Sequence, residues 1–284
     1  MKKGLILEGG AMRGLFSAGI MDVMFENGIR FDGMIGVSAG AAFGCNFKSE
    51  QPGRAIRYNK KYCKDRRYCS YWSWLSTGNI FGADFCYREL PLELDVFDIE
   101  AFEKNPLEFY MVCTDVENGN ALYKKCEKAD ADCFEYMRAS ASMPLVSKMV
   151  AVGGRKYLDG ALADSIPLKF FESIGYNRNI VILTQPQGYV KHPSVFQEIL
   201  RFVYRKYPEL VKVMTNRHNI YNETVHYIEE KAEKGEILLL RPDGKLPVKR
   251  MCKNPEILQQ TYNIGRELAV RRLKEIKKFL QKEV

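Results

Sequence analysis

The stretch Gly33-Met34-Ile35-Gly36-Val37-Ser38-Ala39-Gly40 decides the fold of this 284-residue chain. An apolar run leads into a serine that stands between two glycines, and small residues follow it. The pentapeptide from Gly36 to Gly40 has the G-x-S-x-G pattern, which is typical of a sharp strand-to-helix turn that presents a serine hydroxyl. A helix that begins at Ser38 would place free backbone N–H groups and the positive end of its dipole beside that hydroxyl. Ser38 is therefore a candidate nucleophile, provided that the rest of a hydrolytic site can be found in the chain.

The residues before this stretch predict a β-α-β unit. Residues 3–8 form a short apolar strand, residues 9–14 a glycine-rich turn and residues 15–27 a helix with one apolar side. Residues 31–37 return as the second strand, so the two strands are expected to be parallel with a right-handed crossover. The glycine-rich turn then opens at the same carboxyl edge of the sheet as Ser38, which is the edge where open α/β sheets bind ligands.

The rest of the chain changes character near residue 190. Strands are expected at residues 108–116, 121–123, 148–152, 156–158, 179–184 and 236–240, and helices at residues 38–46, 132–142, 167–174, 195–234 and 255–282. We therefore expect an α/β domain over residues 1–190 and a mainly helical C-terminal region over residues 191–284.

Two segments between the second and third strands have no strand pattern. Residues 54–74 alternate basic and aromatic side chains, which would suit a lipid headgroup layer or nucleic acid. We favour the alternative, a surface helix and loop whose aromatic rings pack inward. Residues 78–98 contain Pro91 and few periodic apolar positions, so we expect a loop-rich cap over the site.

The composition is that of an ordinary globular protein, with 46% hydrophobic and 27% charged residues. No apolar segment is long enough to cross a bilayer. The short apolar run near the start is interrupted by Glu8, so we interpret it as a buried strand rather than a signal peptide and expect a cytoplasmic location. A formal net charge of +8 would favour anionic partners, but no nucleic-acid-binding motif accompanies it, and no nucleic-acid partner is expected.

Eight cysteines are spread along the chain without a C-x-x-C pair or histidines at zinc-ligand spacing. We expect most of them to be reduced thiols that pack as small hydrophobic side chains. No metal site is predicted.

The glycine-rich turn Gly9-Gly10-Ala11-Met12-Arg13-Gly14 is the candidate oxyanion hole. Small residues leave the N–H groups of Gly10 and Ala11 free to point at a developing oxyanion, and Arg13 can brace the loop or attract an anionic substrate. A dinucleotide site would need G-x-G-x-x-G spacing and an acidic residue at the end of the second strand. Neither is present, so no dinucleotide cofactor is expected.

The proton acceptor for Ser38 can be an aspartate or a histidine. The histidines His192, His218 and His226 all lie in the C-terminal region, and the order Ser38, Asp159, His218 nominally fits a triad. An α/β-hydrolase normally has several strands before its elbow, whereas this chain has one. We therefore favour Asp159, which ends a strand and is followed by Gly160 and Ala161.

These motifs together resemble the patatin-like phospholipases. The matching positions are Gly9, Gly10, Arg13 and Gly14 in the loop, Gly36, Ser38 and Gly40 in the elbow, and Asp159-Gly160-Ala161 further along. The segment of residues 139–144 also resembles the one before that family's final strand pair. Ala11 departs from the family, which most often has a third glycine there, but alanine still supplies an N–H.

The resemblance implies a patatin-like three-layer α/β fold, with a mostly parallel central sheet flanked by helices. It also implies a Ser–Asp dyad without metal or cofactor, in which Ser38 is the nucleophile, Asp159 the base and residues 9–14 the oxyanion hole. The expected activity is that of a serine ester hydrolase on acyl lipids or phospholipids, similar to phospholipase A or lysophospholipase.

Two other functions stay open at the level of sequence. The same acyl-serine could pass its acyl group to another acceptor, which would make the protein an acyltransferase. Alternatively, the chain could be a lipid- or partner-binding module that contacts an anionic membrane through residues 54–74 and the amphipathic residues 271–280. For residues 271–280 we favour packing of Leu273, Ile276 and Leu280 on the core instead.

Overall fold

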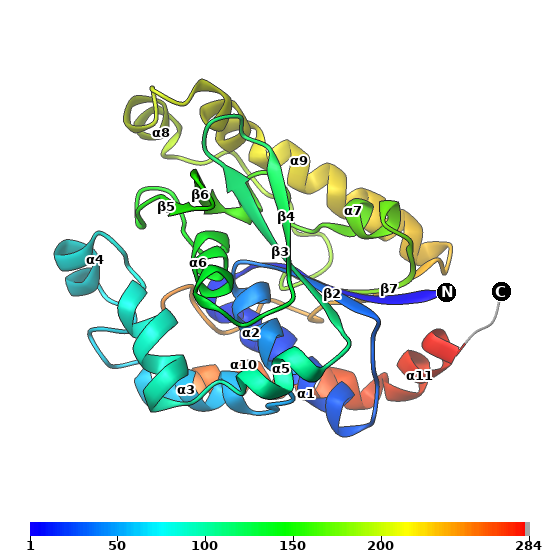
Figure 1. Ribbon diagram of the computed structural model, residues 1–284. Helices are drawn as coiled ribbons and strands as arrows, with labels where there is room; N and C mark the ends of the chain where they lie inside the picture. Colours follow the sequence, from blue (N-terminus) through cyan, green and yellow to red (C-terminus); the bar gives the residue numbers. More distant parts are fainter. Residues whose placement is uncertain (282–284) are drawn as a thin grey trace.

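The structure is a computed structural model, and it describes residues 1–281 (Figure 1). The helix expected to end at residue 282 therefore has its last residue outside the described part. A single mixed sheet of eight strands organises the fold, with the order β5-β6-β3-β2-β1-β7-β8 and β4 paired to β3.

Five strands of this sheet run parallel to one another. They are β1 (Lys2–Leu7), β2 (Gly33–Val37), β3 (Glu108–Asp115), β7 (Tyr176–Ile182) and β8 (Ile237–Leu240). The antiparallel additions on the β3 side are β4 (Ala121–Cys126), β5 (Val150–Val152) and β6 (Arg155–Asp159). Most of the sheet is therefore parallel, as the sequence predicts.

Helices cover both faces of the sheet, which gives three layers (Figure 1). The principal helices of one face are α1 (Gly14–Glu26), α2 (Ala39–Lys48) and α10 (Pro255–Arg271), and those of the other are α7 (Leu168–Ser173) and α9 (Pro208–Glu233). In β1, Leu5 and Leu7 pack in the first of these cores and Ile6 in the second, because successive side chains of a strand point to opposite faces. A strand buried on both faces shows a continuous apolar run, as β1 does.

The C-terminal region shares this framework. Strand β8 extends the sheet beside β7, and α10 packs on α1, where Arg266 pairs with Glu26 through two nitrogen–oxygen contacts of 2.8 Å. In α11 (Leu273–Gln281), Ile276 and Leu280 are buried, so the apolar side of this amphipathic helix faces the core. The division near residue 190 remains a prediction, and the two parts it separates meet in one sheet.

Residues 78–98 differ from the expected loop. Residues Phe85–Leu94 form a π-helix, η2, that contains Pro91, and α5 (Ile99–Lys104) follows it. Phe85 and Leu90 are buried there, while Leu92 is exposed, so tertiary packing of part of the segment holds a helix that the sequence pattern did not indicate. A π-helix has i→i+5 hydrogen bonds, so its side chains do not follow the 3.6-residue period by which an α-helix is recognised in a sequence.

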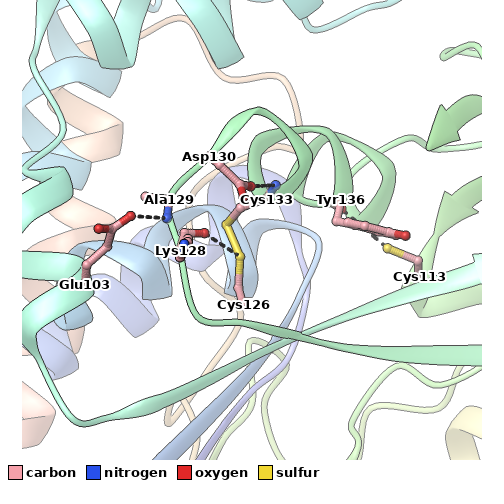
Figure 2. Close-up of a disulfide and its surroundings, with 8 residues drawn as sticks. All are labelled: Glu103, Cys113, Cys126, Lys128, Ala129, Asp130, Cys133 and Tyr136. Atoms are coloured by element: carbon pink, nitrogen blue, oxygen red, sulfur yellow. Dashed lines mark hydrogen bonds between the residues drawn. A yellow bond between two sulfur atoms is a disulfide. The ribbon is translucent and has the colours of Figure 1, made fainter. Parts of the chain in front are cut away.

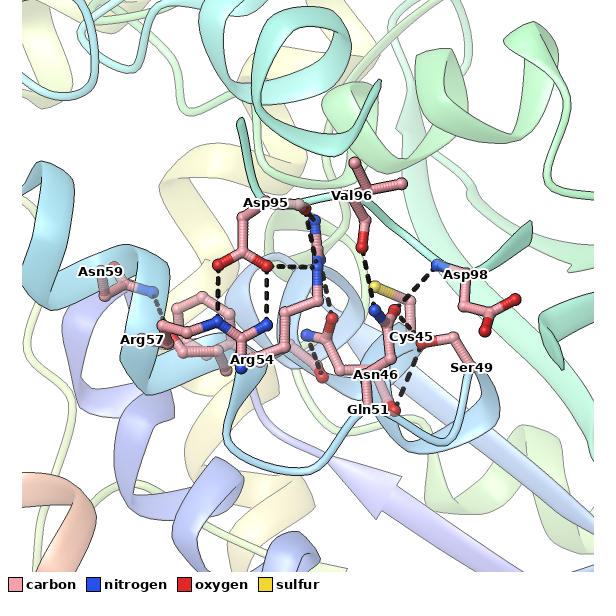
Figure 3. A network of polar contacts seen from close by, with 12 residues as sticks. Cys45, Asn46, Ser49, Gln51, Arg54, Arg57, Asn59, Asp95, Val96 and Asp98 are labelled. Carbon is pink, nitrogen blue, oxygen red and sulfur yellow. Dashed lines mark hydrogen bonds and ion pairs between the residues drawn. The ribbon is translucent and has the colours of Figure 1, made fainter. Parts of the chain in front are cut away.

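A buried ion pair fastens the end of η2 to α3 (Arg54–Tyr62), as Figure 3 shows. Arg54 is 4% exposed; its Nε lies 3.2 Å from Asp95 Oδ1, and its Nη1 donates to Asn46 Oδ1 at 2.8 Å. Arg57 adds two hydrogen bonds of 2.8 Å to the same carboxylate. The segment after η2 is therefore held firmly against the α2–α3 side of the molecule.

The basic-aromatic segment of residues 54–74 divides into two parts. Tyr58, Tyr62 and Tyr68 are buried in the aromatic core, as we expected. Trp72 and Trp74, in α4 (Tyr71–Thr77), are 53% and 39% exposed, so the expectation of inward packing is wrong for α4. This short helix projects from one edge of the molecule, where few neighbours can cover it (Figure 1).

The cysteines also divide. Six are free thiols, but Cys126 and Cys133 form a disulfide that links β4 to α6 (Ala131–Ser140), as Figure 2 shows. Most of the cysteines are therefore free thiols, as we expected, whereas this disulfide was not predicted, because the turn between β4 and α6 brings together two cysteines whose spacing matches no motif. In the part of the chain from residue 1 to residue 281, we find no helix with the length and hydropathy needed to cross a membrane.

Candidate active site

Ser38 occupies the sharp turn between β2 and α2. Its backbone has φ 55° and ψ −120°, a conformation that is strained for any residue except glycine. The turn is tight: a Cβ on Gly36 would lie 2.5 Å from Ala41 N, and one on Gly40 would lie 2.6 Å from Leu7 O. Side chains at these two positions would therefore disrupt the turn, which agrees with the G-x-S-x-G pattern.

Ser140, at the end of α6, holds the elbow from outside. Its Oγ accepts a hydrogen bond of 3.0 Å from Ser38 N–H, and its side chain is fully buried. Within α2, Ser38 C=O accepts the N–H groups of Ala41 and Ala42 at 3.0 Å each. From the sequence, residues 139–144 are recognisable only as a segment similar to one in the resembling family, and a role for Ser140 is not, because its contact with Ser38 is long-range.

Asp159 ends β6 beside β3 and is 4% exposed. Its N–H donates to Ser142 C=O at 2.8 Å, and its Oδ1 accepts the N–H of Ala161 at 2.8 Å. Gly160 and Ala161 begin the short 3₁₀ helix η3 (Gly160–Leu162), for which Asp159 is the N-cap. The tight turn after the strand thus fixes the direction of the carboxyl group.

Burial raises the pKa of Asp159 above its ordinary value. The positive charge of Arg217 opposes this effect most strongly, followed by the hydrogen bonds from Ala161 N–H and the Ser38 hydroxyl. Arg217 lies on α9, and its Nε donates to Ala161 C=O at 2.6 Å. Arg217 could not be identified from the sequence, since nothing in its helical surroundings distinguishes it from a surface cation.

The glycine-rich turn reaches the same place as Ser38 and Asp159. Arg13 N–H donates to Gly10 C=O at 3.1 Å, and Gly14 N–H donates to Ala11 C=O. The N–H groups of Gly10 and Ala11 take no part in these two bonds. Ala11 has a φ of 49°, a left-handed conformation that favours glycine, which gives a physical reason for the third glycine found in the resembling family.

Two cavities meet at Ser38. The residues they share are Ala11, Ser38 and Met143. One cavity, of about 100 Å³, has a mostly apolar lining that includes Met12, Phe43 and Leu90, and we call it the apolar cavity. The other, of about 320 Å³, contains Asp159 and several cationic side chains, and we call it the cationic cavity.

The remaining residues of the turn separate between these cavities. Gly9, Gly10 and Arg13 line the cationic cavity, and Met12 lines the apolar one. Gly14 lines neither and begins α1, where a Cβ would lie 3.0 Å from the Ala39 Cβ. Within the turn of residues 9–14, residues 9–13 therefore each line at least one of the two cavities, and Gly14 lines neither.

The histidines do not stand in a triad. His192 and His218 line the cationic cavity, but within residues 1–281 neither imidazole forms a hydrogen bond with Ser38 or Asp159. His226 is exposed on α9 and lies 3.2 Å from Glu230. Within the same residues, no group of three or more His, Cys, Asp or Glu side chains is placed to hold a metal ion.

The chain resembles known proteins over most of its length. It is 27% identical over 273 residues to the uncharacterized protein YjjU of Escherichia coli (strain K12), covering 92% of this chain and 74% of that protein. The crystal structure of VipD from Legionella pneumophila superposes with a TM-score of 0.48 and 11% identity, over 96% of this chain and 67% of that one. A domain of unknown function, DUF6363, matches residues 207–281. The family model for patatin-like phospholipases matches residues 5–171, which is more than half of the chain, so this protein belongs to the patatin-like phospholipase family.

Proposed function

We propose that this protein is a serine ester hydrolase that cleaves acyl lipids through a Ser38–Asp159 dyad. One observation carries the proposal: Ser38 sits on a strained elbow in the same cavity as the buried carboxyl group of Asp159, whose ionised form the Ser38 side chain favours. Membership of the patatin-like phospholipase family supports lipids as the substrate class.

The reaction proceeds through an acyl-serine. Ser38 Oγ attacks the ester carbonyl while Asp159 accepts the hydroxyl proton, and the N–H groups of Gly10 and Ala11 stabilise the oxyanion. Asp159 then returns the proton to the departing alcohol as the ester C–O bond breaks. A water molecule attacks the acyl-serine, Asp159 takes its proton, and the fatty acid leaves as Ser38 regains a hydrogen.

An ordinary aspartate is too weak a base for this step, since its pKa is about 3.9. Burial raises the pKa of Asp159, and a higher pKa makes the carboxylate a better proton acceptor. Arg217 opposes this rise by favouring the ionised form. The surroundings of Asp159 thus make its carboxylate a stronger base than an exposed aspartate.

The apolar cavity suits an acyl chain. It extends from Ser38 toward η2 and α3 and is lined by aromatic and aliphatic side chains such as Tyr87, Leu90 and Phe134. Its one cation, Arg54, is already paired with Asp95. An acyl chain there would bury apolar surface without leaving a charge unpaired.

We also propose that the protein works at a lipid bilayer, through two exposed apolar helices beside the cationic cavity. On α4, Tyr71 and Leu75 are 70% and 79% exposed; on α8 (Gln197–Val203), Phe202 is 70% exposed. Leu145, which lines the cavity, connects the two: Trp74 Nε1 of α4 donates to its C=O at 3.2 Å, and its N–H donates at 3.0 Å to the hydroxyl of Tyr204, the residue directly after α8. Figure 1 shows α4 and α8 at the same edge of the molecule. We call this pair of helices the docking surface.

Labelling with a fluorophosphonate ester tests the dyad. The probe should modify Ser38, and a peptide map should find the adduct there. Ser38→Ala and Asp159→Asn should each lower hydrolysis of a short-chain p-nitrophenyl ester by at least 10³-fold, as expected for removal of a catalytic group. Ser165→Ala, which changes another serine of the cationic cavity, should retain labelling at Ser38.

Two results would contradict the dyad. An unlabelled, folded protein would exclude Ser38 as a nucleophile. Loss of activity in a folded triple variant of His192, His218 and His226 would restore a histidine base. If added acceptor alcohol diverts the acyl group from water, the product will be a transacylated lipid, and the enzyme is then an acyltransferase with the same dyad.

A further inference from the structure

The cationic cavity carries an excess of positive charge next to Ser38. Arg13 enters it from the glycine-rich turn, and Lys191, Arg217 and Arg250 enter it from the C-terminal region. Within residues 1–281, none of these four side chains forms an ion pair with a carboxylate. Their number exceeds that of the carboxyl groups in the cavity, which are only Glu8 and Asp159.

Both carboxyl groups are engaged by other partners. Glu8 is 3% exposed and accepts hydrogen bonds from the Thr184 N–H and hydroxyl and, at 2.8 Å, from the Tyr221 hydroxyl. Asp159 accepts the N–H of Ala161 at 2.8 Å, and the nearby Ser38 favours its ionised form. Neither is therefore free to neutralise the cations fully.

Arg217 has a hydrogen-bond partner in Ala161 C=O, but Arg13 and Lys191 are less well satisfied. Arg13 Nε is buried and has no hydrogen-bond partner within the described residues. Lys191 Nζ lies 4.0 Å from the centre of the Tyr221 ring, over its face. Burial, and then the charge of Arg217, lower the pKa of Lys191 to about 7, so the side chain is poorly compensated in this state. A bound anion would satisfy such groups with charge-assisted hydrogen bonds.

The position of the cavity indicates which anion it would take. If the carbonyl of an ester lies at Ser38 with its acyl chain in the apolar cavity, its alcohol part must leave on the other side. That side is the cationic cavity, since the two cavities share only Ala11, Ser38 and Met143. In a glycerophospholipid, the alcohol part carries the phosphate.

We propose that Lys191, Arg217 and Arg250 form a subsite for the phosphate of a glycerophospholipid, and that this subsite selects headgroups with a net negative charge. The proposal rests on the hydrolase function above. An ammonium headgroup would find no free carboxylate in the cavity, and Lys191 already covers the Tyr221 face. The C-terminal region therefore supplies substrate selection to a site whose chemistry lies in the first 160 residues.

Soluble short-chain substrates test the subsite without any effect of membrane charge. We would measure kcat/KM for dihexanoyl phosphatidylglycerol and for dihexanoyl phosphatidylcholine, both below their critical micelle concentrations. The intact protein should favour the glycerol headgroup by about tenfold or more, which corresponds to about 1.4 kcal/mol. Lys191→Gln and Arg250→Gln should each reduce this preference severalfold. Lys249→Gln, which removes the same charge from an exposed neighbour outside the cavity, should keep it.

Binding of inorganic phosphate gives a second readout that does not depend on activity. Phosphate should raise the melting temperature of the intact protein and of Lys249→Gln, and less so that of Arg250→Gln. Arg250 is exposed, so its replacement should not prevent folding even if that of Lys191 does.

Each outcome decides a separate point. Ser38-dependent hydrolysis without a headgroup preference would overturn the subsite and leave the hydrolase function intact. Phosphate binding without that preference would mean that the cavity takes free phosphate, and it too would overturn the lipid assignment. Absence of any Ser38-dependent hydrolysis would instead refute the proposed function.

Discussion

At the scale of single residues, the buried carboxyl of Asp159 reduces the stability of the fold whenever it is ionised. Its pKa is raised in the folded protein, so the unfolded chain releases this proton at lower pH than the folded one. Stability is therefore lost as pH rises from about 4, the ordinary aspartate value, through the raised pKa. Placing a base where proton transfer needs it thus works against the stability of the fold.

Replacement of this carboxyl should separate stability from activity. At pH 8, Asp159→Asn should abolish hydrolysis and raise the free energy of unfolding by about 0.5–2 kcal/mol, the range of common stabilising substitutions. The difference from the original protein should become small near pH 3.5, where the Asp159 carboxyl is mostly protonated in the unfolded chain as well. Urea denaturation at the two pH values measures it. A variant that is less stable at pH 8 would show that the ionised carboxylate supports the fold.

At the scale of elements, the docking surface that we propose for membrane binding lies beside the active site. Helices α4 and α8 are short and project apolar side chains, and Leu145 connects them with a φ of 68°, a left-handed conformation that is unusual for leucine. Because Leu145 also lines the cationic cavity, whatever covers these helices lies next to that cavity.

Vesicle co-sedimentation tests this surface. Leu75→Ser and Phe202→Ser should each weaken binding to vesicles of phosphatidylcholine with phosphatidylglycerol by about tenfold, because each removes apolar surface that a bilayer would bury. Val270→Ser is the matched control, since Val270 is 61% exposed but lies on α10. Equal binding by all three variants would refute the docking surface.

At the scale of the whole molecule, what could be predicted from the sequence was the part encoded by local patterns. The β-α-β unit, the elbow at Ser38 and the strand ending at Asp159 each depend on neighbouring residues, and all are present in the structure. The patatin-like fold with a mostly parallel sheet is confirmed.

Features that depend on distant partners escaped prediction. Ser140 and Arg217 support the site through contacts with Ser38 and Ala161, which lie far from them in the chain. The π-helix η2 depends on the core that buries Phe85 and Leu90 rather than on its own periodicity. The cationic cavity, likewise, is assembled from separate segments, around residues 8–13, 38, 143–165, 189–221 and 250, so no single segment carries its signature.

The position of β8 has a consequence for attempts to shorten the protein. Its backbone covers β7 from Asn179 to Ile182, and Leu183 N–H donates to Leu240 C=O at 2.9 Å. A fragment of residues 1–190 would leave this apolar strand with an open row of N–H and C=O groups, which is a template for intermolecular β-pairing. We expect such a fragment to form aggregates in light scattering, whereas a monomer that unfolds cooperatively would contradict this. By covering the edge of β7, the C-terminal region therefore also protects the protein from self-association.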